Sequence, residues 1–262
     1  MVRPATNALK EKLKAGHPTI GVVCPGYWPE LVEICGYLGY DWVQIDFEHS
    51  ALTLSQAAEL VRAAEVAGIT PVGRVALNAS HHIGRILDIG MRGVVVPHLS
   101  SRADAEAAVH AAYFHPYGDR GFGSARASGF WTRYSMQEFV AYTNDETVIA
   151  VIIEDATGVA NLDEILSVPK IDVVSIGHVD LSHSLGMPGD ISNPVVQANM
   201  ATAIKKIRRA GLVLGLGATD GEGARRRIEE QGAGWVIVQL TQLFANGARA
   251  FLAGAARPSA AR

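Results

Sequence analysis

This chain has few cysteines, no long apolar run and only a small net charge. Only Cys24 and Cys35 occur among its 262 residues, which excludes a disulfide framework and favours a reducing cytoplasm. The longest apolar run, 148–153, is far shorter than the ~20 residues that span a bilayer, and segment 1–14 lacks the apolar core of a secretory signal. A formal net charge of −3 gives no field that would attract nucleic acid or an anionic membrane. We therefore expect small molecules and other copies of the chain as partners.

Lysine is also rare, and its positions do not suit covalent catalysis. The lysines are Lys10, Lys12, Lys14, Lys170, Lys205 and Lys206. A Schiff-base mechanism needs a desolvated lysine in the active site, and none of these is expected at the C-terminal end of a strand. A carbanion formed by this protein would have to be stabilised by a metal ion instead.

Apolar residues make up 48% of the chain and gather in eight short runs rich in Val and Ile. Such runs are typical of strands that are buried on both faces, and the segments between them have helical spacing. The expected strands are 20–24, 42–46, 71–75, 93–96, 148–153, 172–176, 212–216 and 235–239. Eight alternating units predict an α/β fold, a single-domain (β/α)8 TIM barrel over residues 1–262. A doubly wound open sheet is the alternative, but no G-x-G-x-x-G motif supports it.

Local signals mark where the helices begin and end. Segments 53–56 and 219–222 have the capping-box pattern of a helix start. Glycines suited to a left-handed helix end are Gly68, Gly90, Gly211 and Gly232. Segment 115–145 has no clean strand, so we interpret it as a loop that serves the active site or a subunit contact, with a short helix at 135–142. A last helix is expected from Gly247, with a frayed tail near 257–258.

Ionisable residues follow five successive strands at the ends where barrel enzymes carry their chemistry. They are Asp46, Glu48, His49, Arg74, His98, Glu154, Asp155, His178 and Asp180. Each has a simpler explanation, as a turn cap, a structural ion pair or a satisfied histidine. Their convergence on one end of the barrel favours a functional site, because buried ionisable groups are costly unless they are paired or metal-bound.

Two of these acids point to a metal. Glu154 and Asp180 follow adjacent strands, and paired carboxylates suit a hard divalent cation such as Mg²⁺ or Mn²⁺. Co²⁺ and Zn²⁺ would also be accepted, although no H-x-x-x-H or C-x-x-C pattern indicates a closed zinc site. His49 is the one evident base for neutral pH, and Asp88 is a candidate to fix its tautomer.

Segment 41–49, DWVQIDFEH, resembles the D-x-x-x-I-D-x-E-H signature of the HpcH/HpaI aldolases, which are class II pyruvate-dependent enzymes such as 4-hydroxy-2-oxoheptanedioate aldolase. Further similar blocks follow in family order. They are LDIG at 87–90, VP at 96–97, PYGDRG at 116–121, SARA at 124–127, IE at 153–154, NLDEI at 161–165 and GHVDLS at 177–182. The resemblance spans roughly residues 20 to 240.

The resemblance implies a (β/α)8 barrel that cleaves or forms 4-hydroxy-2-oxo acids from pyruvate, or a related 2-oxo acid, and an aldehyde. Glu154 and Asp180 would bind the metal, and Arg74 would hold the keto or enolate oxygen. His49, supported by Asp88, would shuttle the proton, with Asp46 and Glu48 orienting His49 and metal-bound water. Gly177, His178, Val179 and Asp180 would contact the substrate. A role in aromatic compound catabolism and a homohexamer or trimer, with the last helix on a neighbouring subunit, are also implied.

The chain departs from the family pattern at two positions, where many relatives have Pro in place of His178 and Gln in place of Ile152. A bulkier or differently substituted 2-oxo acid therefore stays open. Arg120 and Arg126 match the family loop and could contact either substrate or another subunit.

Three rival functions are open. A citrate-lyase-β-like enzyme acting on acyl-CoA esters would need a basic landing surface, which Arg120, Arg126 and Arg133 could partly provide. A catalytically silent barrel with a binding role is the second. A phosphate-binding barrel using 215–219 ahead of a helix is the third, although a simple capped helix explains that segment as well.

Overall fold

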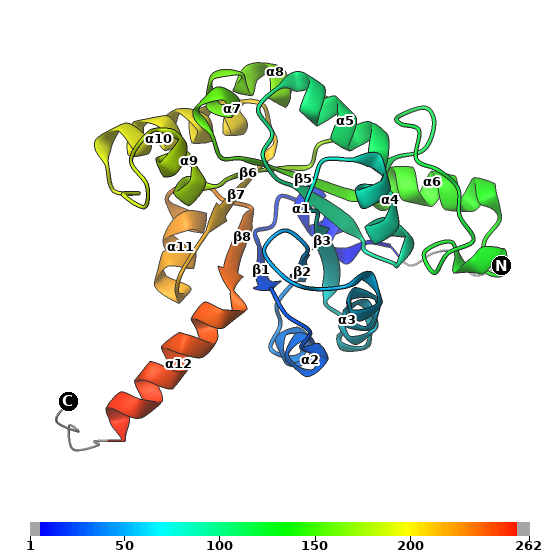
Figure 1. Cartoon of the computed structure of the whole chain (residues 1–262), viewed down its shortest axis with the longest axis horizontal. Coiled ribbons are helices and arrows are strands. Elements are labelled where there is room, and N and C mark those ends of the chain that lie inside the picture. Colours follow the sequence, from blue (N-terminus) through cyan, green and yellow to red (C-terminus); the bar gives the residue numbers. More distant parts are fainter. Residues whose placement is uncertain (1–5, 256–262) are drawn as a thin grey trace.

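The structure, a computed structural model, describes residues 6–255, and within this range eight parallel strands form a closed barrel (Figure 1). The strands are β1 (Thr19–Cys24), β2 (Trp42–Asp46), β3 (Thr70–Arg74), β4 (Gly93–Val96), β5 (Val148–Ile153), β6 (Val173–Ile176), β7 (Val213–Gly217) and β8 (Trp235–Gln239). β8 pairs with both β7 and β1, and this second pairing closes the sheet. The predicted TIM barrel is confirmed, and every predicted strand is present with its ends shifted by one residue at most.

Helices surround the barrel, with a short helix before β1. They are α1 (Ala8–Lys14), α2 (Pro29–Tyr37), α3 (Leu54–Ala67), α4 (Ser80–Asp88), α5 (Arg102–Ala112), α6 (Met136–Glu146), α7 (Ala156–Ala160), α8 (Leu162–Leu166), α9 (His178–Ser184), α10 (Pro194–Arg209), α11 (Gly221–Glu229) and α12 (Leu240–Gly254), with a 3₁₀ turn at Gly129–Trp131. No helix within residues 6–255 combines the length and apolar character needed to cross a membrane.

The helix-start predictions have mixed outcomes. The capping box at Thr53 is present, since its side chain accepts from the Gln56 N–H. At 219–222 the prediction is wrong by one residue: Asp220 is the N-cap, and its Oδ1 accepts from Gly223 N at 2.7 Å. The helix predicted at 135–142 does begin after Ser135 but continues to Glu146. The last helix begins at Leu240 rather than Gly247, and the predicted tail at 257–258 lies outside the described residues.

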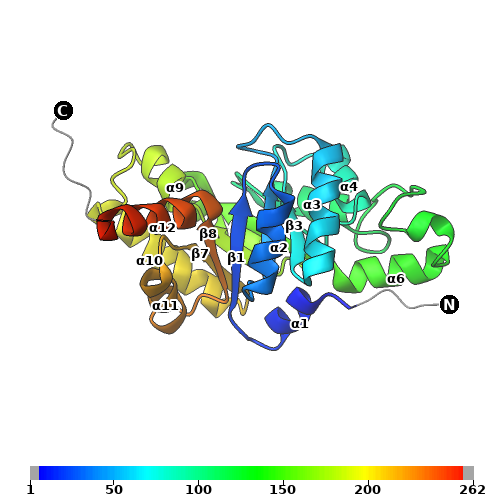
Figure 2. The same cartoon turned by 90° about the horizontal axis from the view of Figure 1, so that it is seen from below.

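The barrel interior is filled by side chains and closed at its N-terminal end by α1. The rings of Trp42 and Trp235 stack at its centre with centroids 3.6 Å apart. Leu9 and Leu13 of α1 pack against this cluster. The buried Lys10 ammonium lies 3.2 Å from Asp172 Oδ2 and donates to the Thr147 carbonyl at 2.5 Å. Figure 2 shows α1 below the strand that follows it, so this helix leaves only the opposite end of the barrel open.

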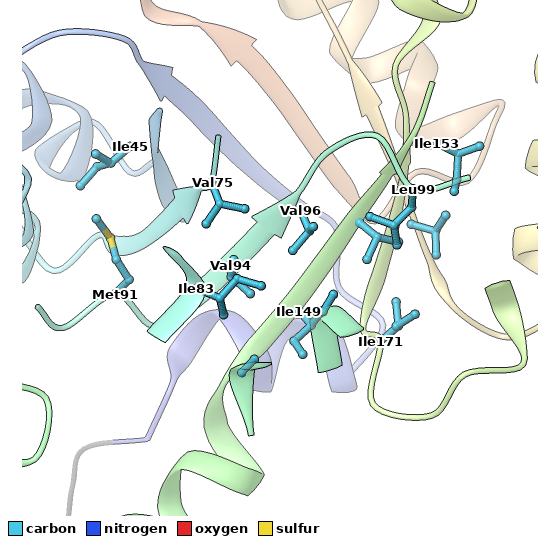
Figure 3. Close-up of a cluster of buried hydrophobic side chains, with 14 of the residues drawn as sticks. Ile45, Val75, Ile83, Met91, Val94, Val96, Leu99, Ile149, Ile153 and Ile171 are labelled. Atoms are coloured by element: carbon cyan, nitrogen blue, oxygen red, sulfur yellow. The ribbon is translucent and has the colours of Figure 1, made fainter. Parts of the chain in front are cut away.

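A second apolar layer holds the helices onto the outside of the strands. Figure 3 shows part of it, with Ile83 of α4 beside Val94 of β4 and Ile149 of β5 nearby. These side chains are buried, and side chains of the same strands on the other face enter the interior cluster. Burial on both faces explains why the strands read as continuous apolar runs in the sequence.

The long segment between α5 and β5 lies at the N-terminal end of the barrel, because it leads from the end of a helix to the start of a strand. Its contacts agree with this placement: Nη2 of Arg120 donates to Asp88 Oδ1 at 2.6 Å, and Arg126 pairs with Glu65 near the end of α3. The interpretation of this loop as part of the active site of its own barrel is therefore wrong. Its use as a subunit contact stays a prediction.

Gly21 makes room for the tryptophan stack, because a Cβ at this position would lie 2.2 Å from two ring carbons of Trp42. We expect Gly21→Ala to lower the free energy of unfolding by about 1–3 kcal/mol through overpacking. Gly84→Ala is the control, since nothing lies within 4 Å of that site in α4 and alanine should stabilise the helix by about 1 kcal/mol. Urea denaturation measures both, and wild-type stability in Gly21→Ala would contradict the packing described.

Candidate active site

The open end of the barrel, where the strands terminate, is organised by an ion pair between neighbouring strands. Asp46 and Arg74 are register partners at the ends of β2 and β3, and their alternation with the interior residues points both side chains into the barrel mouth. Arg74 Nε donates to Asp46 Oδ1 at 2.9 Å, and Nη2 donates to Oδ2 at 2.6 Å. This two-point contact fixes the plane of the guanidinium. Nη1 points away from Asp46 and lies 3.1 Å from Glu48 Oε2.

Asp46 also shapes the turn that follows β2. Its Oδ1 accepts from the backbone N–H of Glu48 at 3.0 Å and of His49 at 3.4 Å. Burial opposes ionisation of this carboxyl, but the hydrogen bonds and charge of Arg74 hold the pKa of Asp46 below its ordinary value. Asp46 is therefore a charged group that positions both the turn and the arginine.

Glu48 contacts Arg74 and two histidines in the mouth. One of its oxygens lies 3.1 Å from Arg74 Nη1 and 3.8 Å from His49 Nε2. The other lies 2.7 Å from His98 Nε2. The Glu48 side chain is largely buried, whereas the imidazole of His49 is 67% exposed and open to approach from solvent. The structure thus brings Asp46, Glu48, His49 and Arg74 together, as the sequence predicted.

Glu154 lies directly after β5 and carries a buried carboxylate. Its Oε1 accepts from His98 N at 2.8 Å and lies 3.0 Å from His98 Nδ1. Burial raises the pKa of Glu154; His98 lowers it, while the charges of Asp180 and Glu48 raise it further. Three carboxylates therefore repel one another around this position.

His98 has the satisfied contacts that the sequence allowed for a rim histidine, and its partners are two acids of the site. Its backbone has a φ of +58°, in the left-handed region, which directs its N–H at Glu154. Its ring spans the gap between Glu48 and Glu154. Strained backbone of this kind gathers at functional sites, but a φ angle leaves no mark in a single sequence.

Asp180 and its neighbours reach the same mouth from the start of α9. Gly177 closes β6, and a Cβ there would lie 2.6 Å from Glu154 Cβ and Oε2, so only glycine allows the two segments to approach. His178 and Val179 form the first turn of α9 with Asp180. Burial, and then the charge of Arg227, lower the pKa of His178.

Asp88 does not join this group within one chain. It ends α4 at the N-terminal end of the barrel, where it pairs with Arg120, whereas His49 lies at the opposite end. Support of His49 by Asp88 would therefore require a second copy of the chain.

The phosphate-binding alternative is disfavoured by the cap of α11. The carboxylate of Asp220 occupies the helix start, accepting from Gly223 N and from the Thr219 hydroxyl. A phosphate there would meet this negative charge instead of free N–H donors.

The acids of the mouth suit a divalent cation. Within residues 6–255, no three His, Cys, Asp or Glu side chains are arranged to hold a metal ion by themselves. Glu154 and Asp180 could supply two oxygen ligands, and the remaining positions would fall to water or substrate, as hard cations at open sites require. Burial and the neighbouring carboxylates raise the pKa of Glu154. A cation bound beside its carboxylate would offset this unfavourable negative charge.

Comparison with known proteins agrees with this fold. The model of the HpcH/HpaI aldolase/citrate lyase family matches residues 19–237. A 2-keto-3-deoxy-L-rhamnonate aldolase of Escherichia coli O17:K52:H18 is 35% identical over 243 residues, covering 92% of this chain and 90% of the relative. The solved structure of a family protein from Burkholderia cenocepacia J2315 is 30% identical with a TM-score of 0.89, covering 96% of this chain and 100% of that one. An HpcH/HpaI aldolase from Desulfitobacterium hafniense DCB-2 is 28% identical with a TM-score of 0.88, covering 98% and 100%.

The chain therefore belongs to the HpcH/HpaI aldolase/citrate lyase family. It is an enzyme of the carbon–carbon lyase class, as its sequence predicted.

The Asp46–Arg74 pair generates a prediction about pH. Because the pKa of Asp46 is lowered by folding, the pair contributes stability above the ordinary carboxyl pKa of about 4 and loses it as the pH falls through the lowered value. We expect Asp46→Asn to cost about 3–5 kcal/mol at pH 7, with a smaller difference from wild type at pH 3. Urea denaturation at both pH values measures this. Asp163→Asn, at an exposed ion pair with Lys206, should cost less than about 1 kcal/mol. An equal effect of Asp46→Asn at both pH values would contradict the charge assignment.

Proposed function

We propose that this protein is a divalent-metal-dependent aldolase that makes or breaks 4-hydroxy-2-oxo acids, using the enolate of pyruvate or a related 2-oxo acid. One observation carries the proposal: buried and mutually repelling carboxylates face a fixed guanidinium at the open end of the barrel. The relative from Escherichia coli is named for a 2-keto-3-deoxy acid, which agrees with this substrate class.

Glu154 and Asp180 are the proposed metal ligands. A divalent cation held by them would supply a Lewis acid that stabilises negative charge on the keto oxygen. Mg²⁺ and Mn²⁺ are the ions we favour for two carboxylates with open positions, and Co²⁺ and Zn²⁺ are acceptable alternatives. The backbone N–H groups of His178 and Val179 would hold the substrate carboxylate, since they begin a helix beside Glu154, whereas the Gly177 N–H already donates to the Ile153 carbonyl at 3.0 Å.

Arg74 and His49 carry the remaining roles. Arg74 has its Nη1 directed into the mouth, where it would stabilise the keto or enolate oxygen as charge develops. His49 is exposed to the mouth and would take the hydroxyl proton of the aldol in cleavage and return it in synthesis. Asp46 and Glu48 position these two groups, and Asp88 of a second copy could fix the tautomer of His49.

The rival functions fit less well. An acyl-CoA substrate would gain nothing from Arg120, Arg126 and Arg133 of the same chain, because their loop lies at the opposite end of the barrel. A silent barrel would not need an arginine held at two points beside a cluster of acids.

The test of this function is exchange of the pyruvate methyl protons with D₂O, followed by NMR with and without EDTA. Exchange that stops with EDTA and returns with Mg²⁺ or Mn²⁺ is the expected result, because enolate formation needs the cation but no aldehyde. Glu154→Gln and Asp180→Asn should abolish exchange and metal binding while circular dichroism is unchanged. Glu106→Gln, a surface carboxylate paired with Arg102, should behave as wild type. Metal-independent exchange, or exchange at the wild-type rate in both site variants, would contradict the proposal.

The enzyme is further proposed to be a homo-oligomer in which α12 packs on a neighbouring copy, in a trimer or hexamer. α12 extends away from the barrel (Figure 1), and none of its residues is buried although it carries Phe244, Phe251 and Leu252. An apolar cavity of about 490 Å³ lies beside its base, lined among others by Ile20, Leu38 and Ile228. α12 is 15 residues long and leaves its apolar side chains uncovered, and the cavity is an apolar groove that the same chain leaves open. The α12 helix of a neighbouring copy would cover such a groove.

We expect Phe244→Glu combined with Phe251→Glu to dissociate the oligomer, because both rings are more than three-quarters exposed in the single chain and would be buried on assembly. Sedimentation velocity at micromolar concentration measures the mass. Val66→Glu, at an equally exposed apolar residue of α3, should leave the mass unchanged. A wild-type monomer, or an unchanged mass in the double variant, would refute this packing.

A further inference from the structure

The Glu154 carboxylate is held through one of its two oxygens, by groups from the loop after β4. The His98 N–H donates to Glu154 Oε1 at 2.8 Å, and His98 Nδ1 lies 3.0 Å from the same atom. Oε2 lies against Gly177 instead, since a Cβ at that position would lie 2.6 Å from it. One oxygen is thus occupied by His98, and the other lies beside the start of α9, which carries Asp180.

The backbone of His98 is fixed where this contact needs it. Its φ of +58° lies in the left-handed region, which a residue other than glycine adopts only when its surroundings hold it there. The next residue, Leu99, is fully buried, and its N–H donates to the Ile152 carbonyl at 3.2 Å. Consecutive N–H groups of this loop therefore bind β5 and the acid that follows it, so the loop is attached to the segment that carries Glu154.

The other ring nitrogen of His98 connects Glu154 with Arg74. His98 Nε2 lies 2.7 Å from Glu48 Oε1, and Glu48 Oε2 lies 3.1 Å from Arg74 Nη1. The imidazole therefore lies between two carboxylates that would repel each other, and it joins the ion pairs of β2 and β3 to the acid after β5. The last torsion of a glutamate is broad, so contacts of this kind decide where its oxygens point.

We propose that His98 is a positioning residue for the metal site: its N–H and Nδ1 hold Oε1 of Glu154 so that Oε2 is presented to the cation beside Asp180. This inference rests on the proposed aldolase function, in which Glu154 and Asp180 bind the metal. The ring would contact the ligand and not the ion. Groups that orient a metal ligand contribute to the affinity for the ion, and their loss costs about 10–100-fold.

The experiment measures the Kd for Mn²⁺ by electron paramagnetic resonance, with the full chain and without substrate. His98→Gly is the principal variant, because glycine keeps the left-handed backbone and its N–H while removing the ring. Its Kd should rise by about 10–100-fold. His98→Asn should recover most of the affinity, since asparagine tolerates this backbone and its Nδ2 can donate in place of Nδ1. His98→Gln places its amide nearer to Glu48 and should recover little.

His110→Ala, at an exposed histidine of α5, is the matched control and should bind Mn²⁺ as wild type does. Circular dichroism checks that each variant is folded. An unchanged Kd in His98→Gly would overturn the inference, and so would a lower Kd, because the ring would then compete with the cation for Glu154. Equal recovery by the asparagine and glutamine variants would also overturn it, since the contact with Glu154 would not be the one that matters.

Two further comparisons separate this inference from the aldolase proposal. If wild type binds Mn²⁺ and Glu154→Gln does not, a His98→Gly enzyme with wild-type affinity refutes only the role of His98. If wild type fails to bind Mn²⁺, or if Glu154→Gln binds it equally well, both proposals fail. Exchange of the pyruvate methyl protons in His98→Gly should return to the wild-type rate when Mn²⁺ is saturating, because the defect lies in affinity. A rate that stays low at saturating Mn²⁺ would contradict a positioning role.

Discussion

All eight strands run in the same direction around a closed barrel, and this constraint decides where groups from distant parts of the chain can meet. Every strand delivers its last residue to one end, so Asp46, Arg74, Glu154 and Gly177 become neighbours although up to 131 positions separate them. The helix that directly precedes each strand ends at the other end, which α1 closes. Loops that follow a strand therefore lie at the catalytic end of the barrel, and loops that lead into a strand lie at the closed end.

Directionality also explains which sequence predictions succeeded. The strands could be located because burial on both faces produces continuous apolar runs, and the acids and Arg74 could be located because they directly follow those runs. Direction also limits Asp88 and the segment after α5, because both lie at the N-terminal end of the barrel and can reach a barrel mouth only in another copy of the chain. A residue at the end of a helix cannot share a barrel end with one at the end of a strand in the same copy.

Other features depended on geometry that no pattern encodes. The left-handed backbone of His98 turns a rim histidine into the link between Glu48 and Glu154. α1 was not foreseen, because a seven-residue helix of mixed polarity gives little periodic signal, and its burial depends on the tryptophans that it covers.

The electrostatics of the mouth follow from unequal numbers of fixed charges. Asp46 neutralises most of Arg74 at two points, so Glu48, Glu154 and Asp180 share only what remains of that charge. A divalent cation bound beside them would offset the excess of negative charge.

The segment between α5 and α6 occupies the closed end of the barrel, where Arg120 and Arg126 pair with Asp88 of α4 and Glu65 of α3. Insertions, deletions or new side chains there leave the positions of the strand ends unchanged. Variation in this segment therefore leaves the groups at the strand ends of its own barrel in place. It would reach the reaction only through a second copy, if Asp88 beside Arg120 lies against the mouth of a neighbouring barrel.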